Sequence, residues 1–182
     1  MTLLITTSHR PTRRIRTLSH DLQRVLPNSL RINRGKLNFE GVVEEALTLG
    51  ADRLMFLERW KGAPGKIELH TLKPIVQRYF PIIYLTSVRL QDEFHGPTSV
   101  RGKLIATVPE KAEPELRRFS EALANFLQIP LATKEPDTKE FSAILVFDAE
   151  RSKPVMTFKR SPNGTETGPR LFTKNLIWSD KG

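Results

Sequence analysis

The spacing of apolar and polar residues predicts an alternation of strands and helices along the chain. An apolar, β-branched run at residues 3–7 predicts a buried strand. The helix that follows begins near Pro11 and ends near Leu26, because apolar positions recur there every three or four residues. These positions are Ile15, Leu18, Leu22, Val25 and Leu26. Further strands are predicted at 29–33, 54–58, 67–72 and 82–90, and a second helix at 39–49.

A repeat with a constant offset relates the start of the chain to its middle. Leu3 aligns with Leu104, an offset of 101 residues, and the apolar positions of the first helix then align with a predicted helix at 113–127. The same offset carries through a strand, a helix and the next strand, so it is more than the shared period of two helices. Later strands are predicted at 141–147, 154–159 and 171–178.

The repeat predicts an α/β fold of two similar halves, each built on a strand–helix–strand unit. We expect the first half to span residues 1–92 and the second to span residues 101–182, with a junction at 93–100. The second half skips the helix that corresponds to residues 39–49.

The distribution of charge points to an acidic partner. The chain has 182 residues, of which 38% are hydrophobic, and a net charge of +9. Residues 1–40 hold eight Lys and Arg against two Asp and Glu, and residues 151–182 hold seven against two, whereas residues 41–150 hold 14 against 16. Basic chain ends of this kind are typical of nucleic-acid binding. If the last strand pairs into or beside the sheet of the first half, the two ends form one basic surface.

The first helix carries arginines on its polar side. Arg13 and Arg14 fall in its first turn, where positive charge opposes the helix dipole at a cost of about 0.5 kcal/mol each. A bound phosphate would satisfy the free N–H groups and the arginines together. The alternative is an Arg-rich face that is merely solvated. We predict RNA contacts from nine basic residues: Arg10, Arg13, Arg14, Arg16, Arg24, Arg34, Lys36, Arg160 and Arg170.

Residue types exclude several kinds of chemistry. The absence of cysteine excludes a disulfide scaffold, a thiol nucleophile and cysteine-ligated zinc, and no two of the four histidines have i, i+4 spacing. No segment approaches the roughly 18 apolar residues of a membrane span, and the apolar start is too short for a signal peptide. We therefore expect a soluble, cytoplasmic protein without a metal or cofactor and without membrane contact.

Several segments together resemble the Brix-domain ribosome-biogenesis family. Residues 4–8 followed by Arg10-Pro11 resemble the family's opening, and residues 30–35 resemble its second strand, with an Asn-Arg-Gly turn. Gly168-Pro169-Arg170 resembles the step before its last strand, and residues 95–98 match its His-Gly-Pro-Thr stretch. The match is closest to the small-nucleolar-ribonucleoprotein branch and its short archaeal relatives, although the long extensions of eukaryotic members are missing.

The resemblance implies both a fold and a function. Each half should resemble the anticodon-binding domain of certain aminoacyl-tRNA synthetases. The protein should be a non-catalytic factor that binds a ribosomal RNA precursor or a guide RNA, assists ribosome assembly and meets other assembly proteins. RNA chaperone activity is one form that this assistance could take. We expect a monomer, located in the cytoplasm, or in the nucleolus if the source is eukaryotic.

Two other functions stay open at the level of sequence. A metal-dependent RNA-processing enzyme would need carboxylates to converge, and the candidates are Asp92, Glu93 and Asp148. A protein–protein scaffold would instead use the basic chain ends to dock an acidic partner. Magnesium-dependent cleavage of RNA would favour the enzyme, and a partner complex that survives nuclease treatment would favour the scaffold.

Overall fold

The computed structural model describes residues 2–60, 63–96, 102–134 and 140–180. Its helices are α1 (Arg13–Val25), α2 (Phe39–Thr48), α3 (Pro114–Leu127) and a short 3-10 helix, η1 (Gln91–Glu93). The N-terminal strands are β1 (Leu3–Thr7), β2 (Ser29–Arg31), β3 (Arg53–Trp60), β4 (Ala63–Thr71) and β5 (Gln77–Arg89). The C-terminal strands are β6 (Leu104–Thr107), β7 (Leu131–Ala132), β8 (Ala143–Glu150), β9 (Lys153–Arg160) and β10 (Glu166–Ile177).

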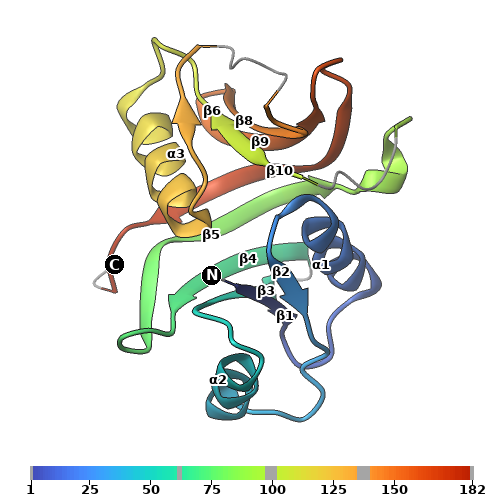
Figure 1. Ribbon diagram of the computed structural model, residues 1–182, viewed down its shortest axis with the longest axis vertical. Helices are drawn as coiled ribbons and strands as arrows, with labels where there is room; N and C mark the ends of the chain where they lie inside the picture. Colours follow the sequence, from blue (N-terminus) through green and yellow to red (C-terminus); the bar gives the residue numbers. More distant parts are fainter. Residues whose placement is uncertain (1, 61–62, 97–101, 135–139, 181–182) are drawn as a thin grey trace.

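Within these residues ten strands form one mixed sheet, in the order β2-β1-β3-β4-β5-β10-β9-β8-β6-β7 (Figure 1). β1 pairs in parallel with β2 and β3, and β6 pairs in parallel with β7 and β8. The other neighbours are antiparallel. β5 and β10 run side by side at the middle of the sheet, so the prediction that the last strand joins the first half's sheet is confirmed.

The local sequence explains where the helices begin and end. The side chain of Thr12 caps α1 by accepting a hydrogen bond from the backbone N–H of Ile15 at 3.3 Å, and Asn38 caps α2 in the same way. α3 has a proline in its first turn, and Gln128 ends it in the left-handed conformation. The predicted helix at 113–127 is confirmed by α3.

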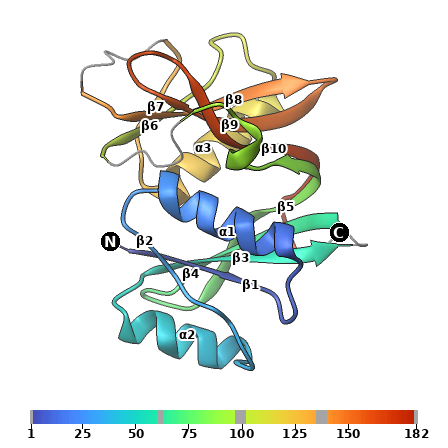
Figure 2. The same ribbon diagram turned by 90° about the vertical axis from the view of Figure 1, so that its right-hand side faces the viewer.

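Both faces of the N-terminal strands are covered by helices. β1 alternates between them: Leu3 joins a large core that includes side chains of both α1 and α3, whereas Leu4 joins a smaller cluster under α2. α1 and α3 therefore lie on one face of the sheet and α2 on the other, and Figure 2 shows α1 and α2 on opposite sides of β1 and β4. In the described part of the C-terminal strands, no helix takes the place of α2.

Polar contacts hold the chain after β5 between α1 and β10. The carboxylate of Asp21 is 1% exposed and accepts a hydrogen bond from the backbone N–H of Gln91 at 2.9 Å. Burial raises the pKa of this carboxyl group. The Gln91 side chain in turn donates to the carbonyl of Gly168 in β10 at 3.2 Å. The predicted junction at 93–100 begins here and continues into residues 97–100, which lie outside the described part of the chain.

The two central strands extend further than their sequences predict. β5 begins at Gln77 rather than at residue 82, because a shift in its register with β4 lets both sides of Pro81 stay paired. β10 begins at Glu166 rather than at residue 171. A register shift between Glu166 and Arg170 accommodates Gly168 and Pro169, which therefore lie inside the last strand and not before it.

Candidate nucleic-acid interface

The carboxyl ends of the parallel strands β1, β2 and β3 meet at one edge of the sheet. β1 ends at Thr7 and pairs there with Leu57 of β3, and the backbone N–H of Ser8 still donates to the Leu57 carbonyl at 2.9 Å. α1 begins six residues after β1, so its N-terminus lies at the same edge. In α/β sheets this edge is the usual ligand-binding edge, since loops and helix N-termini converge on it.

Two loops at this edge lie against each other. The ring nitrogen Nδ1 of His9, which follows β1, is 3.2 Å from the carbonyl oxygen of Gly35, which follows β2. Gly35 has a φ of +57°, a left-handed conformation that favours glycine, and this turn brings its carbonyl to the histidine. The contact places the loop that carries Arg10 beside the loop that carries Arg34 and Lys36.

The first turn of α1 adds positive charge to the same edge. Arg13 lies in this turn, which contains no acidic residue, and Arg16 follows one turn later. Both side chains are exposed because the core-facing positions of α1 are taken by residues such as Ile15 and Leu18. The side chains of Arg13 and Arg16 therefore face solvent beside the N-terminus of α1, which is an arrangement that suits phosphate.

Arg14 has a different role from its neighbours. Its Nη2 donates to the carbonyl of Val88 at 2.6 Å and lies 3.1 Å from the Glu93 carboxylate. The backbone N–H of Leu90 and the guanidinium of Arg14 lower the pKa of Glu93. Arg14 thus ties α1 to the end of β5, and a substitution there would disturb the fold as well as any ligand.

One basic residue at this edge was not among the nine predicted. Leu57 of β3 lies opposite Thr7, the last residue of β1, and Arg59 lies two residues further along β3. The strand pleat puts the side chains of Leu57 and Arg59 on the side of the sheet that α1 covers. We call Arg10, Arg13, Arg16, Arg34, Lys36 and Arg59 the basic edge. Within the described part of the chain, none of these six forms an ion pair.

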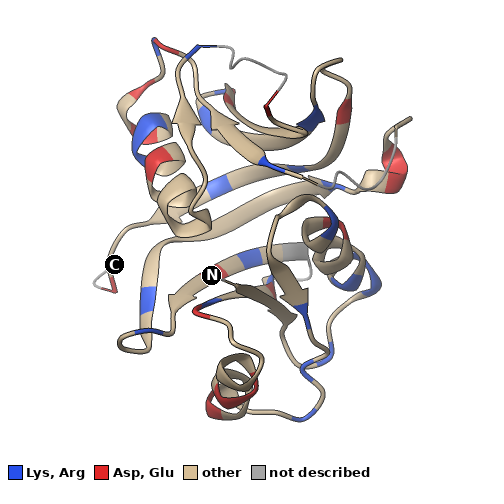
Figure 3. Ribbon diagram, viewed as in Figure 1, with Lys and Arg blue, Asp and Glu red and all other residues tan. Residues whose placement is uncertain are grey.

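The positive potential extends from the basic edge along α1. Partial burial, together with the charges of Arg31 and Arg24, lowers the pKa of His20 on the exposed side of this helix. Arg24 itself lies 3.5 Å from Asp21, near the far end of α1, and lines an open hollow of about 830 Å³ between the two parts of the sheet. Figure 3 shows Lys and Arg concentrated along α1 and the loops beside it, while η1 and α2 carry Asp and Glu.

The last two predicted residues lie away from the basic edge. Arg170 precedes Leu171, whose side chain lies in the core under α1, so the strand pleat directs Arg170 to the opposite face of the sheet. There it pairs with Glu150 at 2.9 Å and lies 3.8 Å from Glu166. Arg160 is exposed at the end of β9. The basic ends are therefore joined through the sheet, but Arg170 does not share a surface with Arg13.

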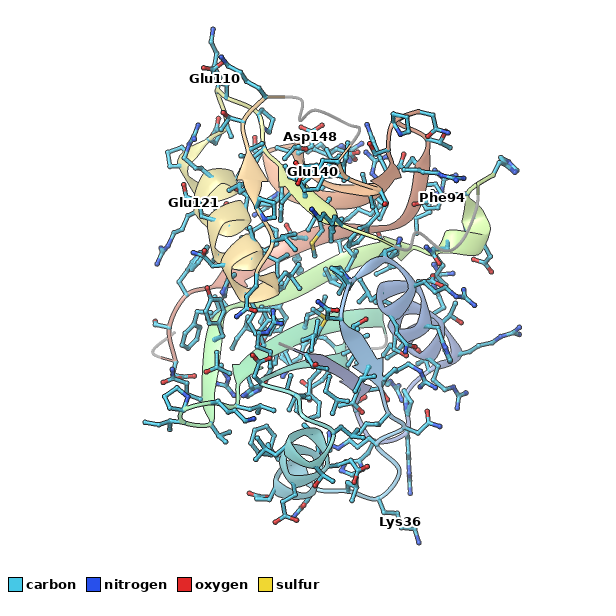
Figure 4. All side chains as sticks on the ribbon, in the orientation of Figure 1. Lys36, Phe94, Glu110, Glu121, Glu140 and Asp148 are labelled. Atoms are coloured by element: carbon cyan, nitrogen blue, oxygen red, sulfur yellow. The ribbon has the colours of Figure 1, made fainter. Side chains whose placement is uncertain are left out.

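The corresponding edge of the C-terminal strands has the opposite character. The loop after β6 carries Glu110, and the first turn of α3 carries Glu115 where α1 has Arg14. Figure 4 shows Lys36 projecting at one end of the molecule and Glu110 at the other. The first turn of α3 thus lacks the arginines that the first turn of α1 carries.

The described residues contain neither a metal-binding cluster nor a membrane-spanning helix. Among the described residues, no group of three His, Asp or Glu side chains is placed to hold a metal ion, and Glu93 is occupied by Arg14. Within the same residues, no helix is long and apolar enough to cross a membrane.

Known proteins that are similar to this chain in sequence share one description. No protein-family model matches the chain. The chain is 45% identical to the probable Brix domain-containing ribosomal biogenesis protein of Pyrococcus furiosus, over 98% of this chain and 86% of that protein. It is 31% identical to the protein of the same description from Methanopyrus kandleri, over 97% and 95%.

Solved structures agree with these relatives. The crystal structure of a probable ribosomal biogenesis protein from Aeropyrum pernix K1 matches with a TM-score of 0.78 and 25% identity, over 99% of this chain and 97% of that one. The archaeal Imp4-like protein Mil shares the fold, with a TM-score of 0.68 and 18% identity over 97% and 99%. The mixed α/β sheet, the similarity over nearly the whole chain and the sequence segments noted above agree, and the chain belongs to the Brix domain-containing ribosomal biogenesis proteins.

Proposed function

We propose that this protein is a non-enzymatic ribosome-biogenesis factor that holds ribosomal RNA precursor, or a guide RNA, on the basic edge. The relatives described above are named ribosomal biogenesis proteins. The observation that carries the proposal is the basic edge itself: six cationic side chains without an ion pair in the described structure, gathered beside a helix N-terminus. Unpaired arginines repel one another, so a protein that places them together stabilises an anionic partner there.

Binding of this kind requires positioning and no covalent step. Phosphate contacts from flexible basic side chains hold RNA by its backbone, largely without reading base sequence. Because each contact releases condensed counterions, affinity should fall steeply with salt. A factor that binds RNA in this reversible way can favour one RNA pairing over another, which would be its chaperone activity. Assembly proteins would meet the same RNA while it is held.

We also propose that the two parts of the fold are duplicated halves, each similar to an anticodon-binding domain. In both parts the first strand pairs in parallel with the second and third, and α1 and α3 begin 101 residues apart. One hydrogen bond recurs at this offset: Ser19 donates to the Arg16 carbonyl at 2.7 Å, and Ser120 donates to the Arg117 carbonyl at 2.8 Å. Superposition of residues 3–33 on 104–133 tests the duplication.

The test of RNA binding removes charge without touching the core. In the triple variant Arg10→Ala, Arg13→Ala, Arg16→Ala, we expect affinity for a ribosomal RNA fragment to fall by about 10- to 100-fold at low salt. The slope of log affinity against log salt should become shallower by about 2, since three contacts to single-stranded phosphates are lost at roughly 0.7 each. Filter binding or fluorescence anisotropy across a salt series measures both quantities.

The control variant removes an equal charge elsewhere. Lys111, Lys153 and Lys174 are exposed in the C-terminal part, and changing all three to Ala should leave the salt slope nearly unchanged. Thermal unfolding should show the same midpoint for both triple variants. Equal losses of affinity in the two variants would mean that binding depends on net charge alone, and the basic edge would not be the site.

A further inference from the structure

An exposed tryptophan stands beside the basic edge. Trp60 is the last residue of β3 and lies three residues beyond Leu57, the residue that pairs with the end of β1. It therefore lies about 10 Å past the end of β1. Its side chain is 41% exposed. The strand pleat directs Arg59 toward the side of α1 and Trp60 toward the side of α2. The sequence places Arg59 and Trp60 in the near-neutral middle of the chain, and the fold brings both to the basic residues of the first 40 positions.

The indole ring of Trp60 packs against an aromatic side chain of the sheet. The ring of Tyr84, on β5, meets it nearly at a right angle, with the ring centroids 5.0 Å apart. Gly65 approaches from β4, and a Cβ atom there would lie 2.2 Å from the Cβ of Trp60. Only glycine allows β4 to pass so close to Trp60, and the contact with Tyr84 holds the indole against β5.

The charges near Trp60 suit a nucleic acid. Glu58 and Glu68, which lie on β3 and β4 on the same side of the sheet as Trp60, both bind the ammonium group of Lys66, at 2.5 and 2.6 Å. Their negative charge is therefore partly compensated. Four residues before Trp60 on the same strand, the Phe56 ring lies under the guanidinium of Arg34, 5.2 Å from the ring centroid. Arg34 belongs to the basic edge, so an aromatic surface and phosphate-binding groups lie on adjoining parts of one edge.

We propose that Trp60 stacks on a base of an unpaired RNA segment whose phosphates lie on the basic edge. This inference rests on the proposed RNA binding and adds the class of RNA: a single strand, a loop or a bulge. In a continuous RNA duplex the bases are stacked inside the helix, where an indole at the protein surface does not reach them. In an unpaired segment each base offers a π-face, and stacking on an aromatic side chain is tolerant of sequence.

The other tryptophan provides an internal control. Trp178 is packed against the core, and the guanidinium of Arg118 lies 3.9 Å from its ring centroid. A Trp178→Phe variant makes Trp60 the sole source of indole fluorescence. We expect an unstructured RNA of about 12 nucleotides to quench this fluorescence, because stacking brings a base onto the ring. A blunt-ended duplex of two strands, with the same number of phosphates and without a loop, bulge or overhang, should leave it nearly unchanged.

Substitution of Trp60 separates stacking from phosphate contact. Trp60→Ala should weaken binding of the unstructured RNA by roughly 5- to 150-fold, the loss of one stacked base, with no change in the salt slope. Trp60→Phe should restore most of the affinity because it keeps a π-face. Duplex binding should be the same in all three proteins, and equal thermal midpoints would show that the hairpin of β3 and β4 remains folded.

The outcomes distinguish the stacking proposal from the proposed function. If Trp60→Ala binds the unstructured RNA as tightly as the native protein, or weakens both RNAs equally, stacking by Trp60 is overturned. In either case the salt slope of the Arg10, Arg13 and Arg16 triple variant still reports whether RNA lies on the basic edge. A native protein that prefers the duplex would overturn the unpaired RNA class as well.

Discussion

Glu68 lies among three cationic or ionisable side chains on the α2 side of β4. Its carboxylate oxygens are 2.6 Å from Nζ of Lys66, 3.4 Å from Nη2 of Arg78 and 3.6 Å from Nε2 of His70. His70, followed by Lys66 and Arg78, outweighs the effect of burial and lowers the pKa of Glu68 to about 2. The ionised carboxylate is therefore favoured by folding, and the protein gains stability from it at neutral pH.

A Glu68→Gln variant should lose that stability in a pH-dependent way. Because the folded-state pKa lies below the unfolded value, the contribution is fully present above about pH 4.5 and declines as the pH falls toward 2. At pH 7 we expect the free energy of unfolding to drop by about 1–3 kcal/mol. Urea unfolding at pH 7, 5 and 3.5 should show the difference between variant and native protein shrinking. A difference that stays constant over this range would contradict the role of the charge.

Helices were predicted more closely than strands, and the reason is physical. The period of apolar residues in α3 is a local property, so its limits follow from its own sequence. The limits of a strand depend on its neighbours. β5 continues past Pro81 because β4 and β10 pair with different stretches of it. β10 takes in Gly168 and Pro169 because the chain after β5 packs against it, which no local pattern reveals.

The close packing of Phe94 against Gly168 predicts how substitutions at the two positions change the stability of the protein. A Cβ on Gly168 would lie 2.4 Å from Cε2 of Phe94, and the residue has a φ of +64°. Gly168→Ala should therefore lower the free energy of unfolding by about 2–4 kcal/mol, from backbone strain and overpacking together. In a Phe94→Ala background the same substitution should cost about 1–2 kcal/mol less, since only the backbone strain remains. Chemical unfolding of the four proteins measures this coupling, and an equal cost in both backgrounds would refute the packing explanation.

The composition of the basic edge shows where sequence reasoning about a site reaches its limit. Arg13 could be found because an arginine in a first helical turn opposes the helix dipole, and Arg10 lies just before that turn. Arg59 and Trp60 could not, since their segment is nearly neutral and only the parallel pairing of β1 with β3 brings them to the same edge. Conversely, Arg170 belongs to a basic segment but points to the other face. Net charge by segment identifies the kind of partner, and strand order and pleat decide which residues meet it.

The two parts of the molecule interlock across the middle of the sheet. α1 contacts β10 of the C-terminal part, and α3 contacts β5 of the N-terminal part. Arg53 at the start of β3 is 6% exposed and donates to the carbonyl of Phe126 in α3 at 2.5 Å. The hydroxyl of Tyr79 on β5 donates to the carbonyl of Ala122 at 3.0 Å. Each part thus supplies apolar surface and hydrogen-bond partners that the other needs.

This interlocking predicts that neither part folds alone. A fragment of residues 1–92 would expose the β5 edge and the side of α1 that packs on β10, and a fragment of residues 101–182 would lose the partners of α3. Unfolding of the full chain in urea should be one cooperative transition, the same by circular dichroism and by tryptophan fluorescence. Each fragment alone should show weak secondary structure and no cooperative transition, whereas an equimolar mixture should regain both. A cooperative transition for residues 1–92 alone would show that the N-terminal part is an independent domain, and the shared core would then be a docking interface between two folded units.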